Sequence, residues 1–123
     1  MIHFLENLPS NIVGFKATGE ITEADFTDTI LPKVKALIDK TDKLNYLLLL
    51  ETSVKNFTIG AWMKDVMMGI KNLTKWNRVA IVSDEEAIRN FTNFFSYLMP
   101  GEFKGFKHKD LHEAIDWVSE KSN

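Results

Sequence analysis

Two short, uninterrupted apolar runs stand out in the pattern of hydrophobic and polar positions. One covers residues 46–50 and the other residues 79–82; each has polar residues on both sides, and a segment with helical spacing separates them. Runs of this length are too short for a buried helix and are typical of strands buried on both faces. Two such strands joined through a helix predict a right-handed βαβ unit in a covered, parallel sheet.

The first 20 residues alternate in a way that favours a hairpin. Residues 2–5 and 12–18 are prone to form strands, and the intervening residues 7–11 carry Pro9 and two Asn residues that favour a turn. We therefore expect an antiparallel pair at the start of the chain.

The segment after this hairpin has the spacing of an amphipathic helix. We expect it to start at Glu23, with Thr22 and Asp25 as capping residues and Pro32 as the site of a kink. Its apolar stripe consists of Phe26, Ile30, Leu31, Val34, Leu37 and Ile38.

Three further helices are predicted along the rest of the chain. The first opens near residue 58 or 59, the next follows a Ser83 to Glu86 capping box and ends at residues 100–101, and the last starts at residues 110–113. The apolar residues expected to face the core are, in the first of these helices, Trp62, Val66, Met67, Ile70 and Leu73; in the second, Ala87, Ile88, Phe91, Phe94, Phe95 and Leu98; and in the last, Leu111, Ala114, Ile115 and Val118.

Phe103 and Phe106 flank Gly105 and predict a short edge strand with a bulge. The full order is then ββαβαβα(β)α. We expect an α/β fold with a mixed, mostly parallel sheet covered by about four helices. No linker, repeat or low-complexity tract interrupts residues 1–123, so we expect a single domain.

Composition narrows the class of protein further. The 123 residues are 45% hydrophobic and 26% charged, and the net charge of −2 gives no basic footprint for nucleic acid. The absence of cysteine excludes disulfides and thiolate chemistry and suits a reducing compartment. The first residues lack the pattern of a secretory signal, and no stretch approaches the roughly 20 apolar residues of a membrane span, so we expect a cytoplasmic protein.

Candidate chemistry is sparse. Glu51 and Asp84 follow the two predicted buried strands, at the edge of an open α/β sheet where ligands usually bind. They could hold a divalent metal or act as acid and base, but solvation of Glu51 and helix capping by Asp84 explain them without chemistry. His108, His112 and Asp116 follow one another at intervals of four, and we expect a stripe of solvated side chains rather than a metal site. We predict no cofactor and no metal.

Methionine and aromatic side chains are more numerous than one inward helix stripe can hide. Such surface packs in the core, or it meets a second copy of the chain or an apolar ligand. The candidate residues for binding a ligand or partner are Trp62, Met63, Val66, Met67, Phe91, Phe94, Phe95 and Met99.

The order of these features resembles the SpoIIAA-like family, which belongs to the same fold group as STAS domains and lipid carriers. The resemblance covers almost the whole chain. It rests on residues 19–22 with Asp25 and Phe26, Pro32, the leucine-rich strand before Glu51, Trp62, residues 79–84 and the closing stretch 113–117.

This resemblance implies a non-enzymatic binding module. Antagonists of anti-sigma factors with this fold carry a phosphorylatable serine in an Asp-Ser-Ser-Gly turn after the central strand. Here the corresponding residues 56–60 lack the Asp-Ser pair, and the nearby hydroxyl of Thr58 is expected to serve as a plain helix cap rather than a phosphosite. We expect a module that binds a protein partner, itself or an apolar small molecule or lipid; the alternative is a small metal-assisted enzyme using Glu51 and Asp84.

Overall fold

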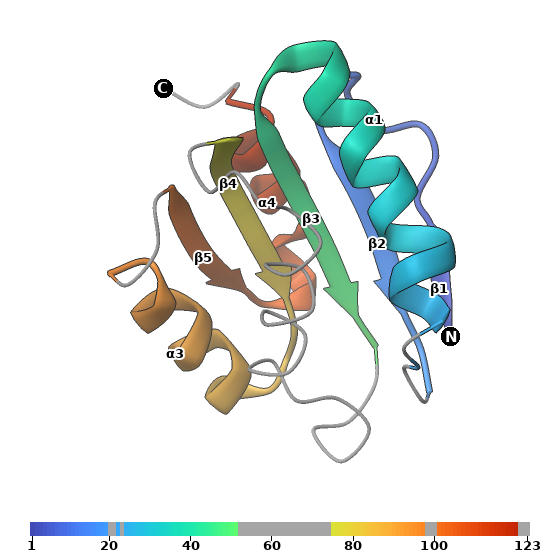
Figure 1. Ribbon diagram of the computed structural model, residues 1–123. Helices are drawn as coiled ribbons and strands as arrows, with labels where there is room; N and C mark the ends of the chain where they lie inside the picture. Colours follow the sequence, from blue (N-terminus) through green and yellow to red (C-terminus); the bar gives the residue numbers. More distant parts are fainter. Residues whose placement is uncertain (20–21, 23, 52–74, 98–100, 121–123) are drawn as a thin grey trace.

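The computed structural model of the protein describes residues 1–19, 22, 24–51, 75–97 and 101–120. A five-stranded sheet runs through this part of the chain, with its strands side by side in chain order (Figure 1). The strands are β1 (Ile2–Phe4), β2 (Val13–Ala17), β3 (Leu44–Leu50), β4 (Trp76–Val82) and β5 (Glu102–Phe106). β1 pairs antiparallel with β2, and every later pair is parallel, so the prediction of a hairpin followed by a mostly parallel sheet is confirmed.

Three α-helices lie within the described residues: α1 (Leu31–Thr41), α3 (Glu86–Phe95) and α4 (Leu111–Val118). A π-helical segment, η1 (Asp25–Ile30), leads into α1, and a short 3-10 turn, η4 (His108–Asp110), leads into α4. The helix expected from residue 58 or 59 lies outside the described residues. The single domain over residues 1–123 stays a prediction.

The apolar run of β3 is explained by helices on both faces of the sheet. Leu44, Tyr46, Leu48 and Leu50 belong to a core shared with α1 and α3, whereas Leu47 belongs to a second core beneath α4. Figure 1 shows α1 in front of the sheet and α4 behind it. Because alternate side chains of a strand enter opposite faces, both sets must be apolar, which produces a continuous rather than an alternating pattern.

Thr22 and Asp25 act as capping residues at the start of the first helical segment, as predicted. Thr22 and Asp25 form a reciprocal pair, in which the Thr22 amide donates to Asp25 Oδ2 at 2.9 Å and the Asp25 amide donates to Thr22 Oγ1 at 3.3 Å. Pro32 does not interrupt a regular α-helix, because it occupies the first turn of α1, where the π-helical segment ends. A proline fits there since amides in a first turn lack an intrahelical partner.

Three details of α3 differ from the prediction. Ser83 is not its N-cap; its hydroxyl accepts a hydrogen bond from the Glu85 amide at 3.1 Å, and the helix begins at Glu86. The helix ends at Phe95 rather than at residues 100–101. Its inward stripe is also rotated, because Ala87 and Phe94 are exposed while Thr92 is fully buried and bonds the Ile88 carbonyl.

The predicted bulge near Gly105 is wrong, since β4 and β5 pair in unbroken register from Glu102 to Phe106. Gly105 instead allows α3 to approach closely: an added Cβ would lie 2.7 Å from Arg89 Cα. The irregularity lies between β3 and β4, where Leu44 pairs with Trp76 but Asn45 pairs with Arg78, which leaves Asn77 as the extra residue.

Candidate functional site

The carboxyl ends of β2 to β5 lie at one edge of the sheet, and three candidate residues follow within two positions of a strand end. Glu51 follows β3, Asp84 lies two residues beyond β4, and His108 lies two residues beyond β5. The five described strands lie in sequential order, so the strand order does not reverse among them.

His108 is the centre of the contacts at this edge. Its Nε2 lies 2.8 Å from the Leu50 carbonyl oxygen and its Nδ1 lies 3.3 Å from Asp84 Oδ2. The backbone amide of His108 also donates to Asp84 Oδ1 at 3.0 Å. Both ring nitrogens are therefore engaged, and the residue connects the ends of β3, β4 and β5.

These contacts correct two expectations. Asp84 does not cap α3, because its carboxylate is directed to His108. His108 is not part of a solvated stripe either: it is half-buried, while His112 and Asp116 are exposed on α4. The three residues form no ligand set, because the carboxyl ends of the strands, and not the helix, determine where His108 lies.

Glu51 and Asp84 have different partners: Glu51 forms an ion pair with Lys16, whereas Asp84 contacts His108. Glu51 Oε2 lies 3.9 Å from Lys16 Nζ, and its side chain is 43% exposed. Within the described residues no group of three His, Cys, Asp or Glu side chains is placed to hold a metal ion. Exposed ion pairs of this kind contribute less than about 1 kcal/mol. These pairs connect the ends of the strands at this edge, where the side chains of Glu51 and Asp84 remain 43% and 69% exposed.

The second candidate region is the outer surface of α3. Phe94 is 58% exposed and Tyr97, in the turn after the helix, is 87% exposed. The two are adjacent, because the Tyr97 amide donates to the Phe94 carbonyl at 3.0 Å. The structure does not describe the side chains of Phe91 and Phe95. The remaining candidates for a phosphosite or a binding surface lie outside the described residues: Thr58, Trp62, Met63, Val66, Met67 and Met99.

Sequence reasoning missed the role of His108, although a signal was present. Asp84 is a candidate because it follows a parallel strand, and His108 follows the next predicted strand in the same way. The spacing of four residues groups His108 with His112 and Asp116, whereas its partners in the structure are Asp84 and Leu50.

The described geometry defines an α/β module in which His108 links the ends of β3, β4 and β5. Comparison with known proteins adds the family: residues 12–119 match the SpoIIAA-like family model, and the chain belongs to this family. Proteins of this fold family are generally non-catalytic modules that often mediate protein interactions.

One solved structure shows the same architecture. It is an uncharacterized protein from Shewanella loihica PV-4 with a SpoIIAA-like fold, 26% identical, with a TM-score of 0.64. The alignment covers 95% of this chain and 93% of that one. Among curated proteins, none matches the chain. In the described part of the chain, no helix has both the length and the apolar character needed to cross a membrane.

Proposed function

We propose that this protein is a non-catalytic module that binds a protein partner through the outer surface of α3. The observation that carries the proposal is the exposure of two adjacent aromatic side chains, Phe94 and Tyr97. Aromatic residues are enriched among the side chains that dominate protein interfaces. The general role of SpoIIAA-like proteins in protein interactions supports the same class of function.

The attachment of α3 to the sheet supports this surface as a docking site. Ser96 Oγ accepts a hydrogen bond from the Phe103 amide, and Asn93 Oδ1 accepts one from the Gly105 amide. The close approach of Arg89 to Gly105 fixes the distance between helix and strand. Phe94 and Tyr97 are thus carried on a well-anchored element, and rigid aromatic side chains lose little conformational entropy on binding.

Photo-cross-linking tests the proposal directly. A benzophenone amino acid replaces Tyr97 in one variant and His112, which is exposed on α4, in a matched control. We expect a discrete adduct with a different protein from position 97 and none from position 112. The same adduct should weaken when Phe94→Ser is added, because truncation of a central aromatic residue weakens binding.

The cross-linked partner is then purified and its affinity measured. We expect Phe94→Ser with Tyr97→Ser to raise the Kd at least about tenfold and His112→Ser to leave it unchanged. An adduct with a second copy of the chain would replace the proposal with self-association. The absence of any adduct specific to position 97 would overturn it, as would a fatty acid or other apolar molecule as the only occupant.

A further inference from the structure

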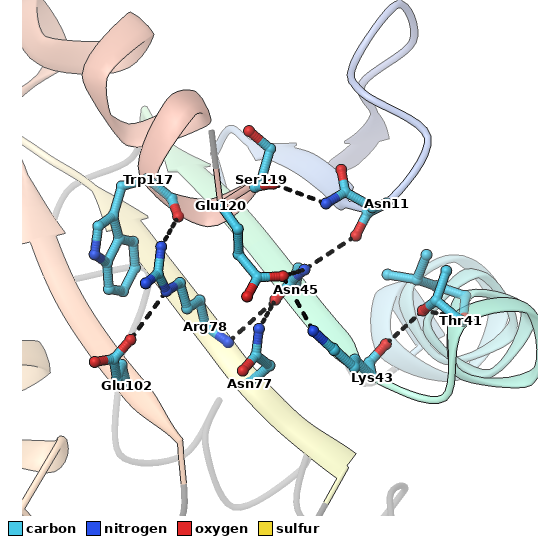
Figure 2. Close-up of polar contacts among 11 residues, drawn as sticks. Asn11, Thr41, Lys43, Asn45, Asn77, Arg78, Glu102, Trp117, Ser119 and Glu120 are labelled. Atoms are coloured by element: carbon cyan, nitrogen blue, oxygen red, sulfur yellow. Dashed lines mark hydrogen bonds and ion pairs between the residues drawn. The ribbon is translucent and has the colours of Figure 1, made fainter. Parts of the chain in front are cut away.

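A polar network fills the opposite edge of the sheet, where the parallel strands begin (Figure 2). At its centre is Asn45 of β3, which is only 2% exposed. Asn45 Oδ1 accepts hydrogen bonds from Asn77 Nδ2 at 2.8 Å and from the Arg78 amide at 3.3 Å. The orientation of the Asn45 amide is therefore set by β4, with its Nδ2 group directed toward Asn11 and Glu120.

That Nδ2 group and a lysine converge on one carboxylate. Asn45 Nδ2 and Lys43 Nζ each lie 3.4 Å from Glu120 Oε2. Asn45 Nδ2 also donates to the Asn11 carbonyl at 3.3 Å. A buried amide donor beside an ammonium group is a favourable environment for a carboxylate, because hydrogen bonds to charged acceptors are stronger than neutral ones.

Glu120 reaches this position from beyond the end of α4. It adopts a left-handed backbone conformation with φ of 65°, which is unfavourable for a residue with a Cβ. The preceding Ser119 carbonyl accepts a hydrogen bond from Asn11 Nδ2 at 2.8 Å, and the Glu120 side chain is 36% exposed. Figure 2 shows this side chain turned back toward Asn45.

The titration of Glu120 agrees with this geometry. Burial raises the pKa of its carboxyl group, but hydrogen bonds with Asn77, Lys43 and Asn45, together with the charge of Lys43, outweigh burial and hold the pKa below its usual range. The donors therefore favour the charged form of the Glu120 carboxyl group.

We propose that Lys43, Asn45 and Asn77 form a carboxylate-binding cradle, which Glu120 occupies as an intramolecular ligand. Asn45 and Asn77 are held in the sheet and Lys43 directly precedes β3, whereas the occupant comes from a strained residue after the last helix. A carboxylate from another molecule can then exchange with Glu120. This site is independent of the surface proposed for α3.

Removal of Glu120 tests the cradle. Glu120→Gly deletes the carboxylate and suits the left-handed backbone, and Glu120→Asn is a second variant that also tolerates this conformation. Sodium acetate is titrated at constant ionic strength, with sodium chloride as the control for general anion effects. The side-chain amide NMR signals of Asn45 and Asn77 report occupancy.

We expect saturable shifts of both amide signals in Glu120→Gly, with a Kd on the order of 10 mM. The wild-type protein should bind acetate at least about tenfold more weakly, because the intramolecular carboxylate competes at a high effective concentration. Adding Lys43→Met should abolish saturation. Equal shifts with chloride, equal binding by the wild type, or no saturation in Glu120→Gly and Glu120→Asn would overturn the proposal.

Discussion

Asn45 is a polar residue that is buried because its side chain hydrogen-bonds the backbone of the neighbouring strand. It lies between Leu44 and Tyr46 in a strand whose other residues are apolar. The extra residue Asn77 in β4 disturbs the ladder, and Asn45 Oδ1 supplies the acceptor for the Arg78 amide at that point. A buried amide without an acceptor costs roughly 1–3 kcal/mol, so the side chain stabilises the bulge.

We therefore predict that Asn45→Leu lowers the free energy of unfolding by about 2–4 kcal/mol, although leucine is apolar and similar in volume. The substitution removes the acceptor for Arg78 and Asn77 and the donor to Glu120. Urea unfolding followed by circular dichroism measures the change. The same replacement at exposed Asn90 on α3 should stay within about 0.5 kcal/mol, and equal effects at the two sites would contradict this role.

At the scale of elements, α3 closes one edge of the sheet. Alternate amides of β5, those of Phe103 and Gly105, point away from β4 and donate to Ser96 Oγ and Asn93 Oδ1 at 3.2 and 2.8 Å. An edge strand with open amides is a template for pairing with another chain. The helix thus protects β5 as well as covering the core.

Asn93→Ala combined with Ser96→Ala should increase aggregation, because it leaves these two edge amides without their side-chain acceptors. Light scattering and thioflavin fluorescence under gentle agitation measure the rate. Ile88→Val is the matched control: it lies on the same helix, is 3% exposed, and costs about 0.5–1.5 kcal/mol without touching the edge. If the two proteins aggregate equally fast, lost stability rather than the open edge explains the effect.

Element type was more predictable than element boundaries. The apolar runs at β3 and β4 predict strands correctly. Helices cover both faces of the sheet, so nearly every residue of these runs is buried and apolar. The Ser83 to Glu86 spacing suggested a capping box, yet the hydroxyl bonds the Glu85 amide in the turn before the helix. Such local hydrogen bonds are alternatives of nearly equal energy, and spacing alone does not choose between them.

At the scale of the whole molecule, the placement of the candidate sites was partly predictable. The positions of Glu51 and Asp84 at the carboxyl edge follow from strand direction alone. Their partners do not, since Lys16 and His108 arrive from β2 and from beyond β5, and only the assembled sheet brings them together. The network around Asn45 was equally hidden, because it joins four distant parts of the chain: Asn11, Asn45, Asn77 and Glu120.

This long-range network predicts an acid-sensitive contribution to stability. The pKa of Glu120 is lowered in the folded protein by the balance of burial against its hydrogen bonds and the charge of Lys43. The folded state therefore binds this proton less readily than the unfolded state. The resulting stabilisation is present above the usual glutamate pKa of about 4.3, and it is lost as the pH falls through the lowered pKa of the folded state.

We expect wild type to exceed Glu120→Gln in free energy of unfolding at pH 7, and the difference to shrink as the pH is lowered below about 4.3. Urea unfolding at several pH values measures both proteins. Glu113→Gln, at an exposed position on α4, serves as a control for the loss of one negative charge. A gap between wild type and Glu120→Gln that stays constant or widens toward acid would show that the Glu120 carboxylate does not stabilise the folded chain through its charge.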